Sequence, residues 1–362
     1  MKIALIHDQL VDYGGAESLF LTLTRMYPEA DIFTGYYDKK NAAYDQIKKR
    51  FVQVSNLPLR TRFSTLGKIL INAYWQSLDL SDYRLVLTLS DTLSCHSVIT
   101  SPESLHVAYI CTPPKYLYAE KPNYYMMGST SWFRKVALSY IRTCDHQAST
   151  RPDVIVVPSV EVQNRVIKYY RRDAVVIPGP VPKPLLPVKK NKQEYYLVFS
   201  RIEAHKGVEL VLQAFSKINK KLVVAGTGRE YKRLKNAYST CNNISFLGWI
   251  PEEAKHELFM KAKALINASQ DEDFGITVIE ALKHGVPVVA YKSGSMREIV
   301  KDGANGFHFD NFSTKSLLSG LLKIEKSPLD VRTIIKSSKQ FSEDKFIKDF
   351  SSLVAKHLGL PG

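Results

Sequence analysis

Short apolar runs and longer amphipathic segments alternate along most of the chain. The apolar runs end at polar residues, glycine or proline, which is typical of the buried strands of a parallel sheet. Between them, apolar residues recur every three or four positions, as in Leu19, Phe20, Leu23 and Met26, which predicts helices. The expected strands are 3–6, 31–34, 52–54, 84–89, 105–110, 154–157, 174–177, 195–199, 221–225, 244–247, 264–267, 286–290 and 306–309. The expected later helices are 62–78, 132–148, 160–170, 207–215, 275–284, 313–326 and 342–357.

The alternation restarts after a proline-rich segment, 178–184, which is followed by a lysine-rich segment ending at Lys192. This is the most linker-like part of the sequence. A chain of 362 residues also exceeds one comfortable core. We therefore predict an α/β protein with two doubly wound domains, 1–180 and 193–340, that face each other across a cleft. The last helix, within 341–362, can pack back on the first domain.

Composition points to an ordinary globular protein with an anionic partner. Hydrophobic residues make up 45% of the chain and charged residues 23%. The net charge is +15, and the pI is about 9.4. A protein with this charge could bind nucleotide phosphates, an acidic membrane surface or a nucleic acid. The basic residues form small scattered clusters without a recognised nucleic-acid motif, so we expect no nucleic-acid partner.

The cysteines and the N-terminus indicate a cytoplasmic protein. The four cysteines lack metal-site or paired spacing, which is simplest in a reducing compartment. Only four apolar residues separate Lys2 from His7, too few for a signal peptide core, and no apolar run is long enough to span a membrane. Apolar and aromatic residues within 62–75 and 116–132 suggest peripheral contact with an anionic inner leaflet.

The stretch 271–290 carries the strongest chemical signal. Glu272 precedes the expected helix and Glu280 lies on its second turn, with seven residues between them. A helix N-terminus suits an anionic phosphate. Carboxylates repel phosphate, so these two more plausibly accept hydrogen bonds from hydroxyl groups. Phosphate and hydroxyls together describe a sugar nucleotide, although Glu272 can equally be a solvated acid and Glu280 a surface residue.

Basic and glycine-rich junctions follow other expected strands. Arg201 and Lys206 lie beyond the carboxyl end of 195–199, where open α/β sheets bind ligands. Together they could neutralise a diphosphate, or they could be separate solvated cations. Gly14 and Gly15 lie between the first strand and helix, where they could bring backbone close to a ligand or form a plain tight turn. His7 and His205 are more often structural in such positions.

Taken in order, these motifs resemble those of the retaining glycosyltransferases of family four, which have the two-domain architecture called GT-B. The resemblance runs from Gly14 to Gly306. The motifs that carry it are Gly14-Gly15-Ala16-Glu17, Ser200-Arg201 with Lys206-Gly207, Gly226-Thr227-Gly228, Phe246 to Ile250, Glu272 to Glu280 with Phe274-Gly275-Ile276-Thr277, Gly285 to Ala290, and Glu298-Ile299-Val300 before Gly303. Within the family, the segment from Leu105 to Tyr116, with Tyr109-Ile110-Cys111-Thr112-Pro113-Pro114-Lys115, resembles the mannosyltransferase-like members of cell-surface polysaccharide pathways.

The resemblance implies a role for each motif. Arg201 and Lys206 would bind the donor diphosphate and stabilise the charge of the departing nucleotide, while Glu272 would hold the hydroxyls of the donor sugar. Glu280 would hold the ribose. The remaining expected donor contacts are the backbone of Phe274, Gly275 and Ile276, the adjacent Thr277, the backbone near Ile250 for the base, and Gly14 with Gly15 for the phosphates.

The resemblance also implies that no metal and no other cofactor is required, because the cations and helix ends supply positive charge. Asp271-Glu272-Asp273 only superficially resembles a metal-binding Asp-x-Asp. The main departure is Cys111, which stands where the family has an active-site histidine. A neutral cysteine is a weak hydrogen-bond donor. How the 6-hydroxyl of the sugar is held, and hence whether the donor sugar is mannose, depends on this position.

The sequence thus predicts a retaining glycosyltransferase that moves a hexose, first of all mannose from GDP-mannose, to a glycan or lipid-linked saccharide. A UDP-sugar donor is one alternative, and a nucleotide-sugar epimerase or a phosphorylase on the same fold is another. A phosphorylase would need a Schiff-base lysine, for which no compelling candidate exists. A carbohydrate-binding protein that has lost catalysis is the alternative from a different class, motivated by Cys111.

Overall fold

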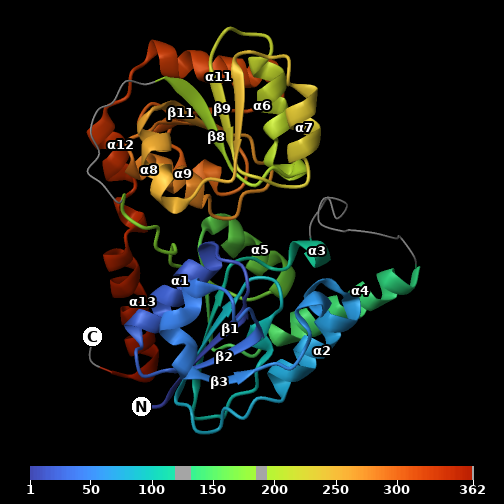
Figure 1. Ribbon diagram of the computed structural model, residues 1–362. Helices are drawn as coiled ribbons and strands as arrows, with labels where there is room; N and C mark the ends of the chain where they lie inside the picture. The colour runs from blue at the N-terminus through green and yellow to red at the C-terminus, as the bar shows by residue number, and fades with distance from the viewer. Residues whose placement is uncertain (119–131, 185–193, 361–362) are drawn as a thin grey trace. The chain divides into compact units, whose positions relative to one another are not determined.

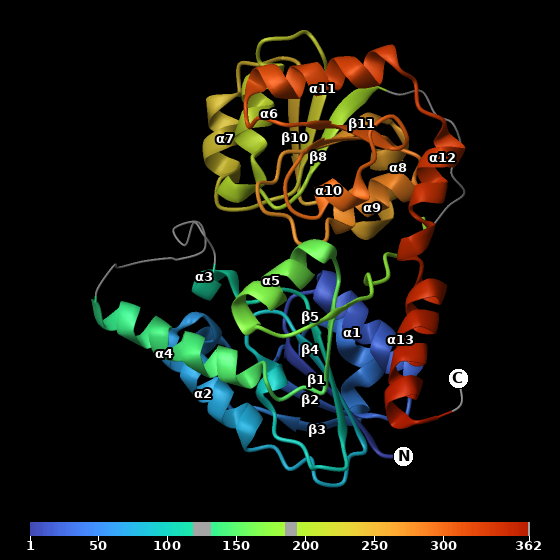
Figure 2. The same ribbon diagram turned by 180° about the vertical axis from the view of Figure 1, so that it is seen from behind.

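The computed structural model describes residues 1–118, 132–184 and 194–360, which form two parallel-sheet units (Figures 1 and 2). The first unit comprises Met1–Pro180 with Asp344–Gly362, and the second comprises Val181–Glu343. Each unit has a single parallel sheet with helices on both faces, so the predicted fold class of two doubly wound α/β units is confirmed. Within the described residues, no helix combines the length and apolar character needed to cross a bilayer.

The sheet of the first unit has seven strands in the order β3-β2-β1-β4-β5-β6-β7. Its strands are β1 (Ile3–Leu10), β2 (Asp31–Tyr37), β3 (Phe51–Val54), β4 (Leu85–Ser90), β5 (Leu105–Ile110), β6 (Val154–Val157) and β7 (Val175–Val176). Its helices are α1 (Gly15–Met26), α2 (Thr65–Gln76), α3 (Lys115–Tyr118), α4 (Trp132–Ala148), α5 (Val160–Tyr170) and α13 (Glu343–Leu358), with short 3-10 segments η1 (Ala42–Arg50), η2 (Leu59–Phe63) and η3 (Cys95–Ser97).

Alternating side chains of the central strands bury both faces of this sheet. In β1, Leu5 packs in one cluster with Phe20 of α1 and Phe346 of α13. Its neighbour Ile6 packs in another cluster with Trp75 of α2. Strands buried on both faces read as continuous apolar runs, which explains why the sequence pattern identified them so directly.

The sheet of the second unit has six strands in the order β10-β9-β8-β11-β12-β13. They are β8 (Tyr195–Phe199), β9 (Leu222–Ala225), β10 (Ile244–Gly248), β11 (Ala262–Asn267), β12 (Val288–Tyr291) and β13 (Gly306–Phe309). Its helical segments are η5 (Ala204–Lys206), α6 (Val208–Phe215), α7 (Tyr231–Ala237), α8 (Glu252–Met260), α9 (Ile276–Lys283), α10 (Met296–Ile299), α11 (Thr314–Lys326), α12 (Val331–Ser337) and η6 (Lys339–Phe341). Leu197 and Val288 face the cluster containing α9, and Val198 and Val289 face the one containing α6 and α11.

Several predicted boundaries were wrong for identifiable physical reasons. Strand β1 continues through His7 and Asp8 to Leu10, because both polar side chains find buried partners. The helix expected over 62–78 divides at Ser64, whose hydroxyl caps α2 by accepting from the Gly67 N–H at 2.9 Å. Strand β12 begins at Val288, after Pro287, which has no N–H for a sheet. The helical segments that the sequence pattern did not predict include η1, α7, α8, α10 and α12.

Candidate functional site

A lysine and a glutamate from two different loops meet beside the carboxyl ends of β8 and β11. Lys206 ends the turn after β8, and Glu272 lies in the loop between β11 and α9. The Lys206 Nζ donates to the Glu272 Oε2 at 2.8 Å, and the two side chains are 15% and 16% exposed. The structure therefore brings together two of the three predicted catalytic residues, at a depth that a ligand can reach.

Helix α9 begins next to this ion pair with an uncapped N-terminus. Gly275 is the N-cap residue, with a φ of 75° that favours glycine, and no side chain caps the helix. A Cβ at this position would lie 2.4 Å from the Cε of Met296. The following Ile276 and Thr277 are half-buried in the first turn, where backbone N–H groups have no partner within the helix. This end of α9 therefore offers N–H donors and the positive end of a helix dipole.

The backbone of Glu272 is held by the loop after β12. The Ser295 N–H donates to the Glu272 carbonyl at 2.9 Å. Gly294 has a φ of 56°, and a Cβ there would lie 2.3 Å from the same carbonyl oxygen. The loop can approach Glu272 this closely because residue 294 has no side chain. Gly294 is thus a site-building residue that the sequence analysis missed, although a Ser-Gly-Ser turn after a predicted strand was a usable signal.

Glu280 lies further along α9 and has a lysine partner. The Lys255 Nζ lies 3.1 Å from the Glu280 Oε1 and 2.7 Å from the Glu252 Oε2. Burial raises the pKa of Glu280, and the positive charge of Lys255 partly offsets this effect. Burial lowers the pKa of Lys255, but attraction to Glu280 and Glu252 outweighs burial, so its pKa is raised overall. Glu280 is therefore a largely buried, charge-paired carboxyl group rather than a solvated surface acid.

The sequence analysis did not single out Lys255, because it did not predict helix α8, on which Lys255 lies. Helix α8 starts after Pro251 and carries Glu252 and Glu253 in its first turn, a recognisable helix-start signal. Its pairing with Glu280 joins residues 25 positions apart, which only the folded unit brings together.

The other predicted donor contacts of the second unit are more dispersed. Arg201 is exposed just after β8, and its side chain makes no ion pair within the described residues. Phe274 packs edge-on against Phe341, with ring centroids 5.8 Å apart. Ile250 is half-buried against the core that contains α9. Arg201 is thus available for a ligand, while Phe274 and Ile250 contribute side-chain packing and leave their backbone as the predicted contact.

In the first unit, the predicted glycines begin α1. Gly14 is the N-cap residue in an extended conformation, φ −151°, and Gly15 is the first residue of the helix. Both are exposed. The conformation of Gly14 is open to any residue, so local geometry alone does not require glycine there. Glu17, three positions later, turns inward and lies 3.7 Å from the Nε2 of His7.

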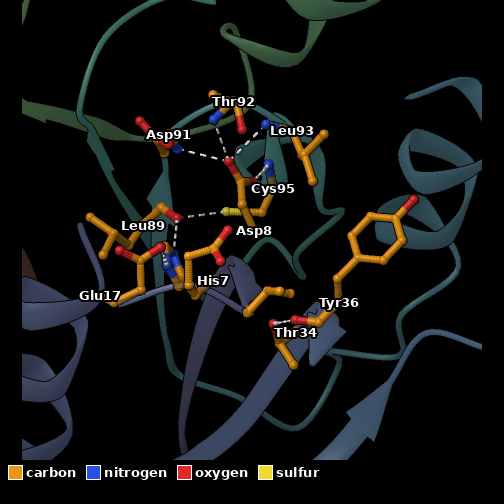
Figure 3. A network of polar contacts seen from close by, with 12 residues as sticks. His7, Asp8, Glu17, Thr34, Tyr36, Leu89, Asp91, Thr92, Leu93 and Cys95 are labelled. Carbon is orange, nitrogen blue, oxygen red and sulfur yellow. Dashed lines mark hydrogen bonds and ion pairs between the residues drawn. The ribbon is translucent and has the colours of Figure 1, made fainter. Parts of the chain in front are cut away.

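The polar residues of β1 form an inward network, shown in Figure 3. The Asp8 carboxylate accepts four backbone N–H groups of the segment after β4, at 2.7 to 2.8 Å: those of Asp91, Thr92, Leu93 and Cys95. The His7 Nδ1 lies 2.8 Å from the carbonyl oxygen of Leu89, to which it donates. Asp8 and His7 therefore fix the loop between β4 and η3, and the strand pattern gave no sign of this role.

Cys111 follows β5 directly and is half-buried against the core of the first unit. Its N–H donates to the Ser90 carbonyl at 2.8 Å. In residues 1–118, 132–184 and 194–360, no three His, Cys, Asp or Glu side chains gather as metal ligands would. The expectations of no metal and no cofactor stay predictions.

Comparison with known proteins gives this geometry a family context. A family model described as "Glycosyl transferases group 1" matches residues 187–343. An uncharacterized glycosyltransferase of Methanocaldococcus jannaschii is 27% identical over 199 residues, covering 54% of this chain and 56% of that protein. The α-1,3/1,6-mannosyltransferase alg2 of Schizosaccharomyces pombe is 25% identical over 360 residues, covering 85% of this chain and 70% of that protein.

A solved structure resembles the whole chain. The apo form of the lipopolysaccharide outer core galactosyltransferase WaaB matches with a TM-score of 0.69 and 16% identity, covering 99% of this chain and all of that one. At this identity the likeness concerns the fold. The chain spans about half the length of the first curated relative, as given above. Residues 187–343 are therefore similar to the glycosyl transferases group 1 family, within a chain that has the GT-B fold.

Proposed function

We propose that the chain is a retaining glycosyltransferase that moves a hexose from a nucleotide-sugar to a glycan or lipid-linked saccharide. The observation that supports this best is the meeting of Lys206 and Glu272 beside the uncapped start of α9. A cation and free N–H groups suit a diphosphate, and a carboxylate suits sugar hydroxyls. One small region thus offers both kinds of contact that a nucleotide-sugar needs.

In the proposed mechanism, the second unit stabilises the departing nucleotide. Arg201, Lys206 and the start of α9 neutralise the charge that develops on the diphosphate, so no metal is required. Glu272 accepts hydrogen bonds from the donor sugar and Glu280 from the ribose. The incoming hydroxyl attacks from the face that the leaving phosphate oxygen vacates, and this oxygen takes its proton. The configuration of the sugar is then retained without a protein nucleophile.

Mannose from GDP-mannose is the first donor that we propose. The similarity to an α-1,3/1,6-mannosyltransferase over 85% of the chain favours it. Cys111, at the position of the family's histidine, leaves a UDP-sugar as the alternative donor. An epimerase on this fold would turn over a nucleotide-sugar without an acceptor, and a degenerate binding protein would turn over none.

We also propose that the protein works at the cytoplasmic face of a membrane. Phe63, Leu66 and Leu70 are 76%, 64% and 41% exposed along η2 and α2, beside the exposed cation Arg60. Exposed apolar residues flanked by cations suit an anionic bilayer. Part of the predicted aromatic contact segment, 119–131, lies outside the described residues. Flotation with phosphatidylglycerol vesicles at low salt tests the idea, and failure to float removes it.

The donor is tested by thermal stabilisation with a panel of nucleoside diphosphates and their sugars. A ligand that binds only the native state raises the melting temperature according to its affinity and concentration. We expect GDP and GDP-mannose to give the largest shifts. Larger shifts with UDP or UDP-sugars would identify a UDP-sugar as the donor in place of GDP-mannose. No shift with any nucleotide would contradict the transferase proposal. Product analysis with and without acceptor separates transfer from epimerisation.

A further inference from the structure

The first unit contains a cavity of about 490 Å³ between α2 and α4, here called the α2–α4 cavity. The two helices run side by side in both views (Figures 1 and 2). Tyr116 of α3, the segment Leu93–Ser94 and Arg151 complete the lining. A cavity of this volume can hold a small organic group such as a sugar. None of the residues implied by the nucleotide-sugar resemblance lines it.

One wall of the α2–α4 cavity is a row of polar side chains. Asn72 and Gln76 lie one turn apart on α2, and the Gln76 Nε2 donates to the Asn72 Oδ1. The Arg151 guanidinium donates to the Gln76 Oε1 at 3.2 Å. Amide groups both donate and accept, so this wall can bind hydroxyl groups in either sense.

Aromatic rings line the cavity together with that polar wall. The Lys68 Nζ lies over the ring of Tyr116, 3.2 Å from its centroid. Tyr140, on α4, is 57% exposed. An aromatic face packs well against the apolar C–H face of a sugar ring. Amide groups combined with the exposed ring of Tyr140 are therefore a lining that suits a saccharide. The nearby cations Lys68 and Arg151 favour a neutral or acidic saccharide over an amino sugar.

The floor of the cavity is fixed in place by buried polar contacts. The Leu93 N–H donates to Asp8 (Figure 3), and Ser94, which also lines the cavity, is the next residue. Ser94 also donates to Asp145, whose Oδ2 accepts from the Tyr170 hydroxyl at 2.7 Å. A floor held by buried hydrogen bonds to carboxylates is pre-organised, which reduces the entropy lost on binding.

Exposed apolar side chains lie on both helices that line the cavity. Leu66 and Leu70 are exposed on α2, and Trp132, Val136 and Tyr140 are 64%, 55% and 57% exposed on α4. On α4 these three residues are four positions apart, so they form one ridge along the helix. That ridge ends at Tyr140, which itself lines the cavity. A polar cavity with apolar ridges at its edge matches a molecule with a saccharide head and a hydrocarbon tail.

We propose that the α2–α4 cavity binds the acceptor, an amphiphilic glycolipid whose saccharide occupies the cavity and whose hydrocarbon lies along the ridges. Calling this glycolipid the acceptor rests on the proposed transfer reaction. The binding itself requires no nucleotide-sugar donor. It adds to the proposed function the place where the acceptor binds and the residues that recognise it: Asn72 and Gln76 for hydroxyls, Tyr140 for the sugar face.

The test is calorimetric binding of dodecyl α-D-mannopyranoside and dodecyl β-D-glucopyranoside to the full chain, below their micelle concentrations. Methyl α-D-mannopyranoside lacks the tail, and dodecylphosphocholine lacks the sugar. We expect one or both dodecyl glycosides to bind more tightly than either partial ligand. Asn72→Leu and Tyr140→Ala should each weaken this binding by about tenfold, the loss of roughly one good contact.

Gln53→Leu is the matched control, because Gln53 is an exposed amide on β3 outside the cavity. It should bind the glycosides like the wild type. All variants should keep their thermal response to nucleotides, which verifies folding and separates this proposal from the donor proposal. Equal binding of dodecylphosphocholine, no binding of either glycoside, or an equal effect of Asn72→Leu and Gln53→Leu would each overturn the saccharide site. Glycoside binding without any nucleotide response would instead contradict the transferase proposal alone.

Discussion

Charged residues at the strand ends of the two units differ in burial and in their partners. In the first unit, Asp8 is fully buried, and backbone N–H groups of its own unit surround its carboxylate. In the second unit, Lys206 and Glu272 pair with each other and remain about one-sixth exposed. The first arrangement fixes a loop. The second keeps charges at a depth where phosphate or hydroxyl groups can compete for them.

This difference separates residues that shape a site from residues that contact a ligand. A buried carboxylate satisfied by backbone is expensive to disturb, so its removal should appear in stability. An ion pair that ligand groups can reach should show the removal of one partner in binding and turnover as well. The same comparison ranks the effects expected from substitutions in the two units.

The largest effect should come from the cations of the second unit. Lys206→Ala or Arg201→Ala should lower turnover by about two to three orders of magnitude, the usual scale for one lost charge-stabilising donor. Initial rates with saturating donor measure this effect. The melting temperature should change little in Arg201→Ala, because Arg201 is exposed.

Arg233→Ala is the matched control for Arg201→Ala. Its side chain is 52% exposed and pairs with Glu209 and Glu230 on the surface of the same unit. This control should keep near-normal turnover. Near-normal turnover in both Lys206→Ala and Arg201→Ala would mean that these cations do not face the phosphates.

The next largest effect should come from Asp8→Asn in the first unit. The amide keeps one acceptor oxygen but places an NH₂ group against backbone N–H donors, which should cost about 2 to 3 kcal/mol of unfolding free energy. Urea unfolding measures this cost. Asp82→Asn is the control, since that side chain is 77% exposed. An Asp8→Asn protein as stable as the control would show that the four N–H contacts contribute nothing net.

A smaller effect should separate backbone strain from crowding around Glu272. Gly294 and Gly303 both have positive φ, 56° and 76°, but only Gly294 lies against another residue. Alanine at either position should cost about 1 kcal/mol from conformation. Gly294→Ala should additionally displace Glu272 and weaken donor binding, whereas Gly303→Ala should not. Equal donor affinity in the two variants would remove Gly294 from the site.

The sequence predicted most of the fold because its strands are continuous apolar runs. Helix α4, strand β8 and strand β13 were predicted with their observed bounds. The same pattern did not predict that strand β1 continues through polar residues such as Asp8. The hydrogen-bond partner that allows Asp8 to be buried lies more than 80 positions away in the sequence. The pairing of Lys206 with Glu272 was implied only loosely by strand-end placement. That of Lys255 with Glu280 depended on a helix that was missed.

The smallest expected effect is a pH dependence of stability in the first unit. Burial lowers the pKa of His7, but the Glu17 carboxylate, Asp8 and the Leu89 carbonyl outweigh burial, so its pKa is raised above 6.5. Phe20 stacks on its ring at 5.0 Å and carries no charge. A raised pKa stabilises the folded state below pH 6.5, and this contribution is lost as pH rises through the folded pKa.

Urea unfolding of the wild type should therefore show a decline in the free energy of unfolding as pH rises above 6.5 and through the folded pKa of this group. Glu17→Gln removes the main charge that raises the pKa, leaving burial to lower it, so the decline should disappear. Glu103→Gln is the control, because Glu103 is an acid 81% exposed in its surface pair with Arg84. If Glu17→Gln and Glu103→Gln give the same pH profile, Glu17 does not raise the pKa of His7. The inward network of the first unit then stabilises the fold through the Asp8 contacts alone.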